Sequence, residues 1–200
     1  MIGGMKTMQL HPAVNIFDPL EGADFDQFVE SIRQHGLIHS IETYQGLIID
    51  GRNRLRACEV AGVKPRFVEV NVNRSAAEYV YTVNCHRRHL TEAAKGFAAV
   101  RYKHQLAEEA KERQRQHGGT APGKRKSLPK NSSELIGDTR DIAGQAFGIS
   151  GFTVDAFEKV LEQGSAELIK AVEDKTVSVS AAAKATQLPK RAQMTVLKPR

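Results

Sequence analysis

The sequence contains no tryptophan, and aromatic residues make up only 6% of it. With 200 residues and 40% hydrophobic content, the chain can bury one or two modest cores but no large one. Its two cysteines, Cys58 and Cys85, cannot form a disulfide framework and indicate a reducing compartment. No signal peptide is evident, and no stretch approaches the roughly 20 apolar residues of a membrane helix. These absences predict a soluble, cytoplasmic protein.

The net charge of +6 is concentrated in one short segment. Residues 111–130 carry seven basic side chains against one acidic side chain, which equals the whole excess. A solubilising segment is one interpretation. A cluster this local, inside the chain, more often binds a polyphosphate. The candidates for DNA contact in this segment are Lys124, Arg125, Lys126 and Lys130.

The first part of the chain alternates strand and helix signals. Pro12 disfavours helix, so residues 10–17 are expected to be extended. Apolar spacing and glycine positions then predict a helix that stops at Gly36, strands over 40–44 and 46–50 joined by a Gln45-Gly46 turn, a helix over 53–61 and a strand over 66–72.

Beyond residue 75 the signals are helical. A short helix is predicted over 76–83, and Thr91 is a good N-cap for a long helix that reaches about Arg115. Glycines, prolines and basic residues without periodicity then predict a flexible linker, after which short helices return. The predicted organisation is a first domain over 1–117, a basic linker over 118–133 and a helical domain over 134–200.

The segment from Thr139 to Val160 has helix-turn-helix spacing. Gly144 is small where the two helices touch, Gly148 makes the turn, and Val154 packs the second helix. A plain helical hairpin is the alternative. In the second helix, expected over 151–161, Asp155 and Glu158 are unfavourable beside phosphates, so affinity must come mainly from the linker. The candidate DNA contacts at the helix start are Ser150 and Thr153.

A strand, a glycine and a helix follow one another from Ile48 to Cys58. The first N–H groups of such a helix lack intrahelical partners, and Gly51 allows close backbone approach. Arg54 is the favoured phosphate ligand of the segment, because Arg52 and Arg56 share another face of the helix. An ordinary surface helix is the alternative.

A second basic loop, residues 84–91, also precedes a helix. It carries Asn84, His86, Arg87 and Arg88, so two arginine-bearing helix starts occur in one small domain. This pairing favours a polyphosphate held between the two segments. Zinc binding by Cys85, His86 and His89 is not supported, because no fourth ligand is evident.

These two segments resemble a known family. Gly51-Arg-Asn-Arg-Leu-Arg-Ala is similar to the Gly-x-x-Arg-x-Arg-Ala box of ParB-type partition proteins, and Asn84-Cys-His-Arg-Arg-His-Leu resembles their following Asn-x-x-Arg-x-x-Leu box. A helix-turn-helix follows, as it does in that family. The resemblance covers roughly residues 10–190 and is closest in character to plasmid- and phage-borne members.

The resemblance implies an α/β (α+β) ParB/sulfiredoxin-like domain that binds CTP or ATP, followed by an all-α helix-turn-helix domain that binds double-stranded DNA. Asn84 would also support a Mg²⁺ ion, which usually keeps water and nucleotide oxygens as ligands. The nucleotide-binding residues implied are Asp50, Gly51, Arg52, Asn53, Arg54, Arg56, Ala57, Asn84, His86, Arg87 and Arg88.

The sequence departs from the family at informative positions. Arg52 and Val83 stand where ParB proteins usually carry glutamates, which puts nucleotide hydrolysis in doubt and leaves Asp50 as the nearby acid. His39-Ser40 replaces the base-reading Gln-Pro, so the choice between CTP and ATP stays open. Sulfiredoxin needs a cysteine where this chain has Arg52, and Cys58 is expected inside the helix.

Three functions follow from these patterns. The leading hypothesis is a bacterial, nucleotide-regulated DNA-binding protein that serves plasmid or phage partition or regulation. An enzyme, either a weak nucleoside triphosphatase or a ParB-like nuclease, is the second. The third is a helix-turn-helix repressor whose first domain is only a scaffold. A homodimer would form through the helical region or through nucleotide-dependent pairing of the first domains.

Overall fold

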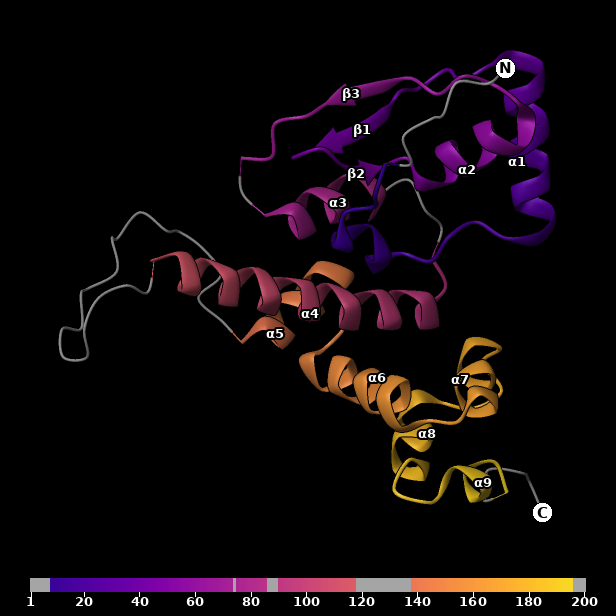
Figure 1. The fold of residues 1–200 in the computed structure, drawn as a ribbon. Helices are drawn as coiled ribbons and strands as arrows, with labels where there is room; N and C mark the ends of the chain where they lie inside the picture. Colours follow the sequence, from indigo (N-terminus) through magenta and orange to yellow (C-terminus); the bar gives the residue numbers. More distant parts are fainter. Residues whose placement is uncertain (1–7, 74, 86–89, 118–137, 196–200) are drawn as a thin grey trace. The chain divides into compact units, whose positions relative to one another are not determined.

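The computed structural model describes residues 8–73, 75–85, 90–117 and 138–195 (Figure 1). The chain divides into two compact units, Met1–Arg87 and Arg88–Arg200, and each is described by itself. Within the described residues, no helix has the length and apolar character needed to cross a membrane.

The first unit is built around a small mixed sheet with strand order β2-β1-β3. β1 pairs antiparallel with β2 and parallel with β3. In chain order its elements are η1 (Pro12–Ile16), α1 (Gly22–His35), β1 (Ile41–Tyr44), β2 (Leu47–Asp50), α2 (Arg52–Ala61), β3 (Phe67–Glu69) and α3 (Ala76–Cys85). The predicted strand-helix alternation is therefore confirmed.

The hairpin between β1 and β2 forms as predicted. Gln45 and Gly46 both have positive φ, at 52° and 76°. Two consecutive residues with positive φ match the right-handed twist of a two-residue hairpin. The turn sets the end of the pairing, in which Tyr44 lies opposite Leu47.

Helices cover both faces of β2. Ile48 and Ile49 are adjacent, so their side chains point to opposite faces of the sheet, yet both are fully buried. Ile48 joins a core with residues of α1 and α2, including Val29 and Cys58. On the other side, α3 packs against β2 and η1. The C-terminal end of β2 is therefore close to the start of α2 and to α3.

The segment 10–17 differs from the prediction of an extended chain. It contains the 3-10 helix η1, which starts at Pro12 with the side chain of His11 accepting a hydrogen bond from the N–H of Ala13. Proline is tolerated in the first turn of a helix because that N–H would be unsatisfied anyway. Burial of Val14 and Ile16 stabilises the turn.

The second unit is entirely helical in its described part. It contains α4 (Glu92–His117), α5 (Thr139–Phe147), α6 (Gly151–Gln163), α7 (Ala166–Glu173), α8 (Val179–Ala185) and α9 (Lys190–Gln193). The hydroxyl of Thr91 accepts a hydrogen bond from the N–H of Ala94, which confirms the predicted start of the long helix.

The long helix α4 belongs to the helical unit, whereas the sequence prediction ended the first domain at residue 117. Phe97 of α4 packs edge-on against Phe157 of α6, with ring centroids 5.1 Å apart. Tyr102 packs likewise against Phe147 of α5, at 5.9 Å. A Cβ atom on Gly96 would lie 2.1 Å from the Phe157 ring, so this glycine lets the two helices approach closely. The predicted linker, 118–133, lies outside the described residues.

Candidate functional site

The start of α2 has the geometry that the strand-glycine-helix pattern predicts. Gly51 is the N-cap, with φ 99° and ψ 20°, and no side-chain hydrogen bond caps the helix among the described residues. A Cβ atom at Gly51 would lie 3.2 Å from the Cα of Ile41 and 2.9 Å from Nε of Arg54. Both the left-handed backbone and the close approach therefore favour glycine.

Arg54, Asp50 and Asn84 meet beside this helix start. A guanidinium nitrogen of Arg54 pairs with Oδ2 of Asp50, and Asn84 Nδ2 donates to Oδ1 of Asp50 at 3.3 Å. Asn84 Nδ2 also donates to the carbonyl of Val80 at 3.0 Å. Asp50 is 8% and Asn84 3% exposed, so the structure brings the two sequence boxes together at a nearly buried polar junction.

The other polar side chains of the box contact a different part of the protein. Arg52 donates to Asn15 Oδ1 at 3.1 Å and to the carbonyl of Phe17 at 2.8 Å. Arg56 donates to the carbonyl of Leu20 at 3.2 Å. These contacts hold the segment between η1 and α1 against α2, so Arg52 and Arg56 share a face as expected, away from Arg54.

Two further residues of the box have structural contacts. Asn53 Oδ1 accepts a hydrogen bond from the N–H of Leu20 at 3.1 Å. Ala57 is fully buried in the core that α2 shares with the sheet. The guanidinium of Arg56 also lies over the ring of Phe25, 4.4 Å from its centroid. The box therefore fastens α2 to the rest of the unit whatever else it binds.

Glu42 and Tyr79 belong to the same junction and were missed by the sequence analysis. Glu42 on β1 lies opposite Asp50 on β2, and the hydroxyl of Tyr79 donates to Glu42 Oε2 at 2.7 Å. Burial and this hydrogen bond raise the pKa of Tyr79, so the phenol stays protonated. Asp50 is thus not the only acid near the helix start. No local pattern marks either residue, because strand pairing and α3 packing bring them there.

Several predicted site residues lie outside the described residues. They are His86, Arg87 and Arg88 of the second box and Lys124, Arg125, Lys126 and Lys130 of the basic segment. Their predicted roles in nucleotide and DNA binding stay predictions.

The helix-turn-helix spacing is confirmed by α5 and α6. A Cβ atom on Gly144 would lie 2.7 Å from the carbonyl oxygen of Ile149. This close approach between α5 and the backbone of the turn explains why the residue is glycine. Gly148 is the left-handed C-cap of α5, with φ 69°, and Val154 is fully buried. The turn therefore forms as the glycine positions indicated.

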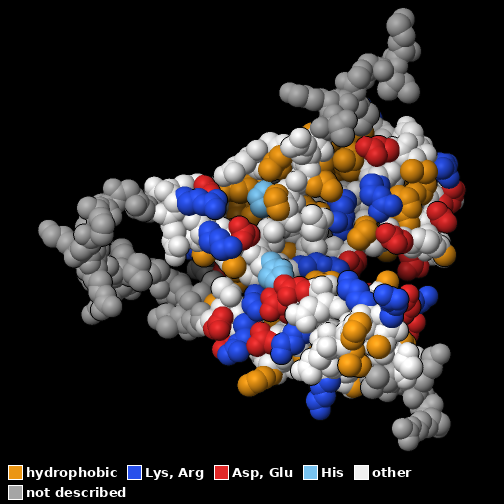
Figure 2. Space-filling model, turned by 60° about the horizontal axis from the view of Figure 1, so that its bottom comes forward, with side chains coloured by type: hydrophobic (Ala, Val, Ile, Leu, Met, Phe, Trp, Pro, Cys, Tyr) orange, Lys and Arg blue, Asp and Glu red, His pale blue; other side chains and the backbone are white. Residues whose placement is uncertain are grey.

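Asp155 and Glu158 of α6 are paired with basic residues of the helical unit. Lys103 Nζ of α4 donates to Glu158 Oε2 at 2.8 Å, and Arg140 Nη1 of α5 donates to Asp155 Oδ2 at 3.1 Å. On the face of this unit seen in Figure 2, acidic and basic side chains are intermingled instead of separated. Neighbouring helices thus supply cations to Asp155 and Glu158, and the predicted unfavourable effect of these two acids beside phosphates stays a prediction.

The start of α6 carries three accessible side chains. Ser150 is the N-cap, accepting from the N–H of Thr153 at 3.1 Å, and the two hydroxyls lie 2.8 Å apart. Phe152 between them is 83% exposed, an unusual degree for an aromatic side chain and one that the sequence analysis did not single out. Ser150 thus caps the helix and Thr153 supplies the capped N–H, besides the DNA contacts predicted for both.

The whole described chain resembles a solved structure. A Pnob8-like ParB-N domain superimposes on it with a TM-score of 0.50 and 15% sequence identity, covering 96% of this chain and 79% of that chain. The chain has the ParB-N fold. The predicted fold class, a small mixed-sheet domain followed by helices, is confirmed. At this identity the likeness shows the fold alone.

Sequence comparison adds no closer relationship. A scan of family models and a search of curated proteins gave no match to the chain. Functional inference for this ParB-N fold therefore depends on its own residues.

Proposed function

We propose that this protein binds double-stranded DNA through its helix-turn-helix and basic segment, and that CTP or ATP bound at the start of α2 regulates that binding. The process served would be plasmid or phage partition, or regulation of transcription. The observation that carries the proposal is a helix-turn-helix of tight geometry, built around Gly144, in a chain with the ParB-N fold.

The DNA part of the proposal is supported by the start of α6. In helix-turn-helix proteins the N-terminal residues of the second helix contact base edges in the major groove. Here Phe152 and Thr153 lie there beside the N-cap Ser150, and Asp155 is neutralised by Arg140. The basic residues 124–130 would supply contacts to phosphates, which give most of the salt-dependent affinity.

The nucleotide part is supported by the start of α2. A helix N-terminus attracts phosphate, and Arg54 lies at this one, paired with Asp50, to which Asn84 also donates. To bind a phosphate, the Arg54 guanidinium would exchange its contact with Asp50 for one with the ligand. The oxygen donors of Asp50 and Asn84 suit Mg²⁺, which would neutralise phosphate charge when bound.

A second function is favoured by a specific observation. Arg52 and Arg56 hold the segment between η1 and α1 in place. Arginines with a purely structural role would make contacts of this kind. If Arg54 serves only to pair with Asp50, the first unit is a scaffold and the protein is a DNA-binding repressor without nucleotide control. The two functions differ in whether nucleotide changes DNA binding.

One calorimetric experiment separates these functions. CTP, ATP, GTP and UTP, each with Mg²⁺, are titrated into the full chain with and without duplex DNA. The proposal predicts that CTP or ATP binds in the micromolar range and changes the affinity for DNA. Absence of binding by all four nucleotides, together with intact DNA binding, would establish the scaffold function instead. Absence of salt-dependent DNA binding would overturn the DNA part.

A further inference from the structure

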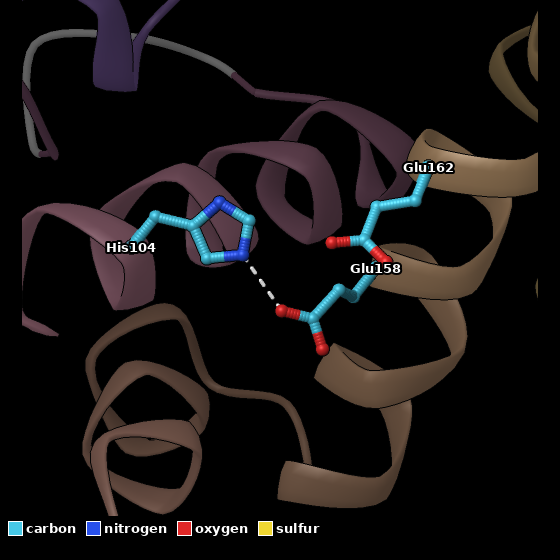
Figure 3. A group of neighbouring side chains, drawn as sticks. All are labelled: His104, Glu158 and Glu162. Carbon is cyan, nitrogen blue, oxygen red and sulfur yellow. Dashed lines mark hydrogen bonds and ion pairs between the residues drawn. The ribbon is translucent and has the colours of Figure 1, made fainter.

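Three side chains with metal-binding atoms gather between α4 and α6, apart from both sites described above. Figure 3 shows His104 reaching from α4 toward Glu158 and Glu162 of α6. One ligand atom from each of the three lies within 4.8 Å of the other two. His104 Nε2 and Glu158 Oε1 are already 2.7 Å apart. Residues 54 positions apart in sequence thus converge on one point.

The two helices hold these residues in a fixed relation. Glu158 and Glu162 are four residues apart on α6, so their side chains lie on the same face, one turn from each other. Next to Glu158, Phe157 packs against Gly96 and Phe97 of α4. Because a larger residue at position 96 would separate the helices, this contact sets the distance across which His104 meets the two carboxylates.

Among the described residues, a basic side chain pairs with only one of the two carboxylates of the cluster. Lys103 donates to the second oxygen of Glu158 at 2.8 Å, which turns Oε1 toward His104. Glu158 is also partly shielded, with 21% of its side chain exposed. Glu162 has no ion-pair partner among the residues that the structure describes. An imidazole binds a metal ion in its neutral form, so this ligand set would place the charges of two carboxylates around the ion.

We propose that His104, Glu158 and Glu162 bind a divalent transition-metal ion, for which Zn²⁺ is the best match. One imidazole, two carboxylates and a water would complete the four positions that Zn²⁺ prefers, whereas Mg²⁺ favours six oxygen ligands. Ligand atoms about 2.1 Å from a tetrahedral ion lie about 3.4 Å apart. Separations from 2.7 Å up to 4.8 Å reach that value through small side-chain rotations.

Such an ion would fasten α6 to α4. The helix-turn-helix depends on the position of α6, and the ion would add a second connection beside the packing of Phe97 on Phe157. Binding to the folded chain alone stabilises it in proportion to the logarithm of the ion concentration. This inference does not depend on nucleotide or DNA binding.

The test is calorimetric titration of ZnCl₂ into the metal-free full chain. Glu162→Gln is the main variant, since Glu162 is exposed and its replacement keeps size while removing the charge. His104→Ala removes the only nitrogen ligand. His35→Ala, at an exposed histidine ending α1, is the matched control. Other histidines and Cys85 can bind zinc as well, so the informative quantity is the difference from wild type.

We expect Glu162→Gln and His104→Ala to lose one equivalent of zinc, or to bind it at least about tenfold more weakly, while His35→Ala retains it. In thermal unfolding, zinc should raise Tm for wild type and His35→Ala more than for Glu162→Gln. If His104→Ala does not fold, Glu162→Gln decides alone. Identical zinc isotherms and Tm shifts for wild type and Glu162→Gln would overturn the proposal.

Discussion

Asn84 of α3 donates a hydrogen bond to Asp50 at the end of β2, with 3.3 Å between Nδ2 and Oδ1. The two residues are 34 positions apart, and the same carboxylate pairs with Arg54 in the first turn of α2. β2, α2 and α3 are therefore joined through one acidic side chain. A ligand that draws Arg54 away from Asp50 would act on all three elements at once.

Replacing Arg54 should weaken nucleotide binding. Arg54→Ala is expected to reduce the affinity for the nucleotide that binds wild type by about tenfold or more, because charge-assisted contacts contribute roughly 1.5–3 kcal/mol. Arg54→Lys keeps a cation beside Asp50 but loses the bidentate hydrogen-bonding geometry of the guanidinium, so this variant should also bind the nucleotide more weakly. Calorimetric titration measures both.

The control for Arg54 is Arg33→Ala, an exposed arginine of α1 that pairs with Glu30. Circular dichroism of each variant checks that the fold is kept. Unchanged nucleotide affinity in both folded Arg54 variants would remove Arg54 from the site and favour the scaffold function.

Gly144→Ala should destabilise the helical unit. The added methyl group would lie 2.7 Å from the Ile149 carbonyl oxygen, which is backbone and cannot move without disturbing the turn. Overpacking of this kind costs about 1–3 kcal/mol in the free energy of unfolding. Urea denaturation measures the change. Gln145→Ala, at an exposed neighbouring position, should change stability by no more than about 0.5 kcal/mol.

The basic segment should dominate the salt dependence of DNA binding. Changing Lys124, Arg125 and Lys126 together to glutamine is expected to reduce the slope of log affinity against log salt by about 2–3, since each phosphate contact contributes about 0.9. Fluorescence anisotropy of labelled duplex at several salt concentrations gives the slope.

As the matched triple variant, Lys64, Lys170 and Lys190 are changed to glutamine, because all three are exposed on described helices or loops. This control should leave most of the slope intact. Equal slopes for wild type and the Lys124, Arg125 and Lys126 variant would show that the segment does not contact phosphates.

The two cysteines should react at different rates. Cys58 is 1% exposed in α2, and burial, with a contribution from Glu59, raises the pKa of its thiol. Cys85 at the end of α3 is only partly buried. Because the thiolate is the reactive form, iodoacetamide at about pH 8 should label Cys85 in the native protein and leave Cys58 unmodified.

Mass spectrometry of peptides from native and urea-unfolded samples distinguishes the two cysteines. Both should be labelled when the chain is unfolded. Rapid native labelling of Cys58 would contradict its place in the core of α2.

Local signals were sufficient for most of the elements. The φ angle or hydrogen bond of one or two residues decides the Gln45-Gly46 hairpin turn, the ends of α2 at Gly51 and Gly62, the Thr91 cap of α4 and the end of α5 at Gly148. Gly144 depends on a contact with the carbonyl of Ile149, only five residues away. Such preferences act over a few residues, so they are visible in the sequence. Pro12 was the exception, because a proline suits both an extended segment and the first turn of a helix.

What the sequence by itself determined is therefore the order of elements and the two arginine-bearing boxes. Only the tertiary structure decided that α4 packs with α5 and α6, that Glu42 and Tyr79 join Asp50, and that His104 meets Glu158. The amphipathic pattern of a helix specifies that one face is buried but not against which partner. That choice depends on the packing of side chains far apart in sequence, for which no local preference exists.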